Sequence, residues 1–130
     1  MHRLALVVIA ACALASGPVF AQPKLGIPFP TVAAALGALK AKPGVKFESN
    51  DGWTIANDTD GAMWSFTPEN HYANPSVGRR ALRQQDGRFF VETQILCQAS
   101  KAACDRLRDD YALLDRRMNE AIQRDLQKKR

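Results

Sequence analysis

The chain has 130 residues, a formal net charge of +5, three cysteines and two histidines. This length allows one domain with a core of modest size. The charge excess is far below that of a typical nucleic-acid-binding domain, and no nucleophile elbow, phosphate-binding loop or dinucleotide-binding motif occurs, so these classes are excluded. The positive charge has two interpretations, an aid to solubility or an attraction to an anionic partner.

The first 21 residues have the features of a secretory signal. A short positive start, Met1–Arg3, precedes an unbroken apolar run, Leu4–Ala15, and small residues precede a cleavage point after Ala21. The apolar run is too short for a good membrane span. A competing lipobox ends at Cys12 but leaves too short an apolar stretch before it. We therefore expect cleavage near Ala21, no lipoprotein, and a periplasmic or secreted mature chain.

The mature chain is expected to begin with an extended lead-in, residues 22–30, which contains three prolines and a glycine. Residues 31–130 then form the single domain. Thr31 is a suitable N-cap for a short helix over residues 32–42, and Pro43-Gly44 ends that helix.

Apolar residues alternate from Val45 onward, which predicts an antiparallel sheet. We expect strands over residues 45–49, 53–57, 62–66, 77–85 and 88–97. The last two strands flank Asp86-Gly87, the preferred dipeptide of a type I′ hairpin turn. In the last strand one side is apolar and the other mixed, which is typical of a sheet with one covered face.

A long amphipathic helix is predicted after Ser100, with apolar residues recurring at three and four from Cys104 to Leu126. The fold class is therefore α+β, an antiparallel meander of three to five strands covered by a long C-terminal helix, with a short N-terminal helix. The long helix would measure about 43 Å in a domain about 35 Å across, so its end should overhang. That end carries Ile122 and Leu126 among basic residues and either frays or docks on a partner, a second copy or a membrane surface.

Signal cleavage leaves two cysteines, Cys97 and Cys104, and an even pair in an oxidising compartment is expected to form a disulfide. Their spacing fits neither a zinc site nor a thioredoxin-type redox motif, and the mature chain has one histidine, so we expect no metal and no cofactor. Cys97 ends the last strand and Cys104 lies one turn into the long helix. The bond would fix the start of the helix on the sheet.

The histidine of the mature chain, His71, lies in a turn-rich loop beside Tyr72. With Glu69 and Arg79 it could supply an acid–base pair and a cation for a phosphate or an oxyanion. This set would make the protein a small secreted hydrolase of phosphodiesters. The structural alternative is a histidine that only makes hydrogen bonds within the fold, and whether the protein is an enzyme is left open.

Arginines on the fourth predicted strand offer a different site. Arg79 and Arg83 should share one face of the sheet and Arg80 the other. Two arginines on one face could bind an anion, or they could be a solvated face that blocks edge-to-edge association. The candidate binding surface that follows from the loop and this strand consists of Trp64, His71, Tyr72, Arg79 and Arg80.

Three segments resemble a group of small exported proteobacterial proteins that has no assigned activity. They are Trp64-Ser65-Phe66-Thr67-Pro68 with His71, then Pro75-Ser76-Val77 with Arg80, then Cys97-Gln98-Ala99-Ser100-Lys101-Ala102-Ala103-Cys104-Asp105. The likeness covers roughly residues 53–122. It implies a bacterial, periplasmic setting and a disulfide, but no reaction.

The sequence therefore favours a small periplasmic, non-enzymatic binding or interaction protein. Its partner is expected to be another protein or an anionic envelope component, with self-association through the end of the long helix as a further option. An inhibitor or immunity protein against an exported toxin belongs to the same class. The hydrolase acting through Glu69, His71 and Arg79 is the alternative.

Overall fold

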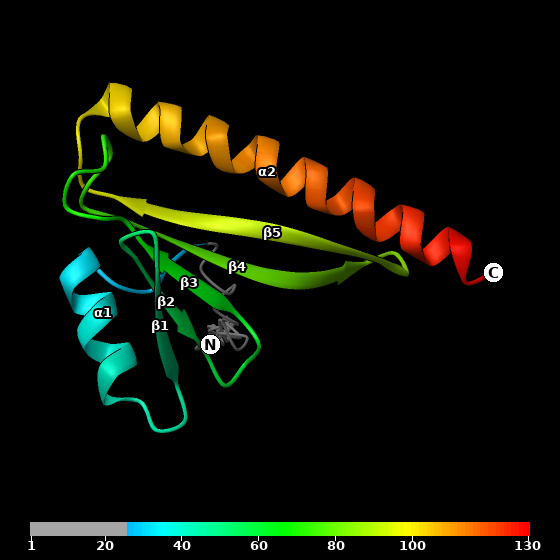
Figure 1. Cartoon of the computed structure of the whole chain (residues 1–130), viewed down its shortest axis with the longest axis horizontal. Coiled ribbons are helices and arrows are strands. Elements are labelled where there is room, and N and C mark those ends of the chain that lie inside the picture. Colours follow the sequence, from blue (N-terminus) through cyan, green and yellow to red (C-terminus); the bar gives the residue numbers. More distant parts are fainter. Residues whose placement is uncertain (1–25) are drawn as a thin grey trace, which may run out of the picture.

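A computed structural model describes residues 26–130, so the predicted signal, the lipobox and the start of the lead-in lie outside the described residues. The fold is α+β: five antiparallel strands form one sheet in chain order, with one helix before it and one after it (Figure 1). The elements are α1 (Val32–Ala41), β1 (Lys46–Asn50), β2 (Trp53–Asn57), β3 (Met63–Phe66), β4 (Ser76–Gln85), β5 (Arg88–Cys97) and α2 (Lys101–Lys128). The predicted fold class is confirmed, and each predicted element lies within one residue of its expected bounds.

Two tight turns explain why the chain folds as a meander. Asp51-Gly52 joins β1 to β2 and Asp86-Gly87 joins β4 to β5, and all four residues have positive φ, from 49° to 81°. The flanking residues pair directly across each turn. A two-residue turn with positive φ at both positions is type I′, whose twist matches that of the strands. The hairpin predicted at Asp86-Gly87 is therefore confirmed.

The main core lies between the sheet and α1. The Thr31 side chain caps α1 by accepting the N–H of Ala34 at 3.1 Å, as predicted. The buried side of α1 then packs on the central strands, where a cluster of buried apolar residues joins Val32, Ala35 and Leu39 to Ala56, Trp64, Phe66 and Val77. This cluster is the principal source of hydrophobic stabilisation in the fold.

The second helix lies on the opposite face, so the expectation of one covered face is wrong. Successive residues of β4 point to opposite faces: Val77 belongs to the α1 cluster, whereas Gly78 lies against Tyr111 of α2. On β5, the side predicted to be mixed ends in Leu96, which packs against the α1 cluster. The alternation of apolar and polar residues along the strands does not by itself show that a helix packs on each face of the sheet, because each helix covers only part of its face.

The predicted disulfide is present and holds the start of α2. Cys97 at the end of β5 is bonded to Cys104, with 5.7 Å between the Cα atoms. The side chain of Ser100 caps the helix by accepting the N–H of Ala103 at 3.2 Å. The first turn of α2 is therefore fixed to the sheet both covalently and by its cap. Neither helix of the described residues has the length and apolar character that a bilayer crossing requires.

The outer edge of β5 is closed by side chains of α2 instead of a sixth strand. Asp115 accepts the N–H of Thr93 at 2.8 Å. The Asn119 amide accepts the N–H of Val91 at 2.6 Å and donates to the C=O of the same residue at 3.0 Å. Gln123 donates to the C=O of Phe89 at 3.3 Å. Four helical residues rise about 6.0 Å and two strand residues about 6.7 Å, so the two spacings almost match. This edge ladder (Asp115, Asn119 and Gln123) occupies backbone groups of an edge strand that could otherwise pair with a strand of another molecule.

The sheet narrows to two strands at one end. Arg80 is the last β4 residue paired with β3, whereas β4 and β5 stay paired as far as Gln85 and Arg88. The hairpin of residues 81–92 therefore extends beyond β3, and the second half of α2 lies along it (Figure 1). We call residues 81–92 and 115–130 the arm, and the rest of the described fold the base.

The arm corrects the prediction of a helical overhang. That prediction assumed a round domain, in which the end of α2 would project alone. Instead the hairpin turn reaches the end of the helix, and Gly87 and Arg88 line a hollow together with Leu126 and Arg130. The helix and the hairpin project together, because the hairpin strands are ten residues long and the other strands are four or five.

Candidate binding site

A pocket of about 300 Å³ lies in the base, between the sheet and the first half of α2. Its lining is mainly aromatic and aliphatic, and it comes from three strands, the β3–β4 loop and the helix: Trp53, Ile55, Ser65, His71, Tyr72, Arg80, Leu107, Asp110, Tyr111 and Leu114. Pockets for drug-sized ligands span roughly 300–1,000 Å³. This pocket is therefore large enough for one ring or one branched side chain.

The β3–β4 loop, residues 67–75, is braced from within and holds two rings at the pocket. Thr67 and Ser76 close its ends, because each backbone N–H is bonded to the other residue, both at 3.0 Å. The Asn74 amide donates to the Thr67 carbonyl and hydroxyl oxygens at 3.2 Å. A loop tied in this way presents His71 and Tyr72 in fixed positions.

Tyr72 fastens this loop to α2. Its hydroxyl donates to Asp110 at 2.5 Å, and the guanidinium of Arg106 lies 4.1 Å from the centre of its ring. Burial, together with the hydrogen bond to Asp110 and the negative charge of that carboxylate, raises the pKa of Tyr72 to about 12. The hydroxyl therefore stays protonated near neutral pH and serves as a donor within the fold.

His71 is neutral and hydrogen-bonded within its own loop. Its ring makes an edge contact with Trp53, with 5.1 Å between centroids, and its Nδ1 accepts the N–H of Ala73 at 3.1 Å. Burial lowers the pKa of His71, and the positive charge of Arg106 lowers this pKa further. The hydrogen bond assigns the ring proton to Nε2. The only basic lone pair of the neutral ring, on Nδ1, is therefore the one that accepts the N–H of Ala73.

Arg80 lines the pocket and carries a buried donor that no acceptor of the described chain satisfies. Its Nε lies 3.3 Å from Asp115, and its guanidinium carbon lies 5.9 Å from the centre of the Tyr111 ring. Its Nη2 is buried and has no hydrogen-bond partner within the described part of the chain. A buried N–H without an acceptor is costly, and the cost is offset if a bound group supplies one.

Gly78 makes room for one wall of the pocket. A Cβ atom at this position would lie 2.8 Å from Cζ of Tyr111 and 3.2 Å from Cγ2 of Thr93. Both distances are shorter than ordinary van der Waals contact. Glycine therefore lets the Tyr111 ring lie directly on the backbone of β4.

The structure divides the predicted binding residues between the two faces of the sheet. His71, Tyr72 and Arg80 line the pocket. Trp64 and Arg79 are cross-strand partners on the α1 side. Trp64 is buried in the core, and the Arg79 guanidinium lies 5.7 Å from its ring centre.

The α1 side has its own hollow of about 520 Å³, lined by both Arg79 and Arg83, which share a face as predicted. Its cations lie beside carboxylates: Lys42 is 2.6 Å from Asp58, Arg79 is 2.8 Å from Asp60 and Arg83 is 2.8 Å from Glu92, although the buried Nε of Arg83 makes no hydrogen bond within the described chain. An anion would have to displace these partners. This hollow is therefore a cluster of ion pairs.

The candidate catalytic set is not assembled. Arg79 lies on the face opposite to His71, and Glu69 is exposed on the loop. The described residues also contain no group of three or more histidine, cysteine, aspartate or glutamate side chains placed to hold a metal ion. The pocket is lined by rings and aliphatic side chains, together with the hydroxyl of Ser65 and the oppositely charged Arg80 and Asp110.

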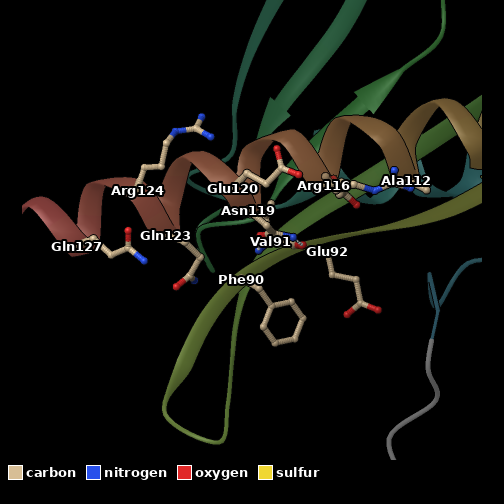
Figure 2. A pocket seen from close by; sticks show the side chains of 11 residues that line it. Phe90, Val91, Glu92, Ala112, Arg116, Asn119, Glu120, Gln123, Arg124 and Gln127 are labelled. Atoms are coloured by element: carbon tan, nitrogen blue, oxygen red, sulfur yellow. Dashed lines mark hydrogen bonds between the residues drawn. The ribbon is translucent and has the colours of Figure 1, made fainter.

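A hollow of about 710 Å³ runs along the arm. Figure 2 shows that Asn119 and Gln123 point from α2 toward β5, whereas Phe90 points away from the helix. Its inner wall is thus the edge ladder, whose polar groups are already bonded to the strand. We assign this hollow to the seam between helix and strand.

Most residues of the pocket region were not among the sequence candidates, and they include Trp53, Asp110 and Tyr111 in its lining and Arg106 against the ring of Tyr72. The alternation of Trp53 with Ile55 was a usable signal for a shared face, but nothing local places α2 above it. Comparison of the chain with family models, curated proteins and solved structures finds no match. The geometry of the pocket is therefore the main guide to its function.

Proposed function

We propose that this chain is an exported, periplasmic, non-enzymatic binding protein whose pocket takes one apolar side chain of a protein partner. The observation that carries the proposal is the buried, unpartnered Nη2 of Arg80 beside a wall of aromatic and aliphatic side chains. Interface anchors are commonly single aromatic or aliphatic side chains that fill such pockets. The disulfide supports an oxidising compartment, and the signal-like first 21 residues support export.

The charges of the pocket favour a neutral ligand. Arg80 and Asp110 are its charged lining residues, and they carry opposite charges, while His71 is neutral. An anionic ligand would bring an unbalanced charge into a partly desolvated site, which is costly. A neutral acceptor such as a peptide carbonyl satisfies Arg80 without that cost. An apolar residue with its own backbone carbonyl therefore fits better than an anionic lipid or polysaccharide.

Site-specific photo-crosslinking in the periplasm tests this proposal. The photoreactive residue p-benzoylphenylalanine replaces either Leu114, which lines the pocket, or Leu113, its neighbour outside the pocket. The two side chains are matched in exposure, at 42% and 41%. We expect a discrete protein adduct from position 114 that is lost when Arg80→Ala is added, and none from position 113. Equal adducts from both positions would contradict a specific anchor.

A second measurement tests the chemistry of the anchor. Nuclear magnetic resonance titration compares N-acetyl-phenylalanine amide with N-acetyl-phenylalanine, which differ in a neutral or ionised end group. We expect the amide to shift resonances of Trp53 and Tyr111 and the carboxylate to bind more weakly. Stronger binding of the carboxylate, or shifts confined to residues outside the pocket, would reject a neutral anchor.

A further inference from the structure

The far end of the arm brings together two segments that are distant in sequence. The β4–β5 turn and the last turns of α2 lie side by side there, and they enclose a hollow of about 400 Å³ (Figure 1). Arg88 and Phe89 come from the hairpin, Leu126 comes from the helix, and Arg130 comes from the residues that follow the helix. We call residues 86–89 and 124–130 the tip.

The tip exposes apolar surface. Phe89 and Leu126, which line the same hollow, are both 41% exposed. Leu82 is 61% exposed and shares the sheet face of Phe89, because Phe89 pairs with Gln84, which lies two residues from Leu82 on β4. Exposed apolar side chains that form a contiguous patch commonly mark an interaction surface, whereas single exposed apolar residues do not.

The tip also gathers positive charge. It holds five cations, Arg88, Arg124, Lys128, Lys129 and Arg130, against two anions, Asp86 and Asp125, for a net charge of +3. None of the five cations belongs to an ion pair within the described chain. The cations of the α1-side hollow, in contrast, have carboxylate partners.

We propose that the tip binds the surface of a membrane that contains anionic phospholipids. Its cations contact the phosphate groups, while Phe89 and Leu126 enter the interfacial region. Apolar side chains ringed by lysine and arginine are the combination that binds such surfaces, because burial of the apolar groups adds to the electrostatic attraction. A soluble polyanion would bind the cations of the tip but would leave its apolar residues exposed to water.

The position of the tip allows the pocket to stay free. Fifteen helical residues separate Tyr111 at the pocket from Leu126 at the tip, which corresponds to about 22 Å along α2. The tip would hold the arm on the membrane while the base extends into the periplasm. This inference does not depend on the proposed protein partner, and it is tested without one.

Vesicle co-sedimentation of the purified exported protein tests the inference. Vesicles of phosphatidylcholine alone are compared with vesicles that also contain the anionic lipid phosphatidylglycerol. We expect binding to the anionic vesicles only. Each lysine or arginine near such a surface accounts for about a fivefold change in affinity. Lys128→Ala/Lys129→Ala should therefore weaken binding about 25-fold.

A matched control separates the tip from net charge. Arg116→Ala/Arg117→Ala removes two exposed α2 cations outside the tip and the same total charge. We expect this variant to bind within about threefold of the parent protein, because charges beyond roughly one Debye length of the surface are screened. Equal losses in both double variants, with unchanged melting curves, would overturn a localised tip. Absence of binding to anionic vesicles by the parent protein would overturn the inference outright.

A fluorescence measurement tests insertion. Phe89→Trp places a reporter at the tip, and Leu113→Trp places one at an equally exposed α2 position outside it. We expect anionic vesicles to shift the emission of the position-89 reporter to the blue and to leave the position-113 reporter unchanged. Binding to soluble polyphosphate as tight as to vesicles, with no blue shift, would identify a general polyanion site and reject the membrane.

Discussion

The base and the arm hold their secondary structure in different ways. Every buried apolar residue of the described chain lies in the base, from Val32 to Leu107. The arm has no buried residue, and α2 is held there by side chains that bond to the backbone of β5. Burial of apolar surface is cooperative and strong, whereas each solvent-accessible hydrogen bond adds little net free energy. The arm should therefore open locally at a lower cost than the base unfolds.

The largest expected effect is the loss of a ring from the core. Phe66 is buried beneath α1, and Phe66→Ala should lower the free energy of unfolding by about 3–5 kcal/mol, because it removes transfer energy and leaves a cavity. Urea denaturation followed by circular dichroism measures this loss. Phe89→Ala in the arm is the matched control and should cost under about 1 kcal/mol. Similar losses in the two variants would mean that the arm contributes to the core.

The disulfide ranks second, because it links the two regions. Cys97→Ser/Cys104→Ser should lower the free energy of unfolding by about 2–3 kcal/mol in the chain-entropy model for a loop this short. The same change should raise hydrogen exchange along the arm, since the first turn of α2 would no longer be fixed to β5. A destabilised protein whose arm exchanges at the parent rate would show that the edge ladder holds α2 without the bond.

The edge ladder gives a smaller and more local effect. Asn119→Ala leaves both polar groups of Val91 to water and should cost about 1 kcal/mol. Amide exchange at Val91 should rise well above that of residues in β2. Glu120→Ala, at an exposed neighbouring position, is the control and should change stability by less than about 0.5 kcal/mol. An unprotected Val91 in the parent protein would contradict the ladder.

Local sequence signals predict the helices and strands well. The packing of α1 and α2 on the two faces of the sheet and the formation of the pocket depend instead on contacts between residues far apart in the sequence. Turn dipeptides and caps act within a few residues, so Asp86-Gly87 and Ser100 could be read directly. Tyr72 and Asp110, in contrast, are 38 residues apart. Trp64 was a candidate for binding because nothing local shows that Phe29 lies 6.1 Å from its ring. Only the placement of α1 distinguishes a core tryptophan from an exposed one.

The smallest predicted effect is a dependence of base stability on pH. Burial lowers the pKa of His71 in the folded state below its ordinary value of 6.5. Just below pH 6.5 the unfolded chain therefore binds more protons at His71 than the folded chain does. The contribution of His71 to stability is fully present above about pH 6.5 and is lost as the pH falls toward the pKa of His71 in the folded state. Other histidine side chains are absent from residues 26–130, and the carboxylates titrate mainly at lower pH. The slope in this window therefore belongs to His71.

Thermal melting between pH 5 and 8 measures this slope in the parent protein and in His71→Gln. The glutamine amide can accept the N–H of Ala73 and does not titrate, so it retains a partner for the loop while removing the proton linkage. We expect the parent melting temperature to fall on acidification and the variant to stay nearly flat above pH 5. In Asp110→Asn the melting temperature should fall more on acidification than it does in the parent protein, because the Asp110 carboxylate opposes the lowering of the pKa of His71. A variant that keeps the parent slope would place the titration elsewhere and leave His71 with a purely steric part in the pocket.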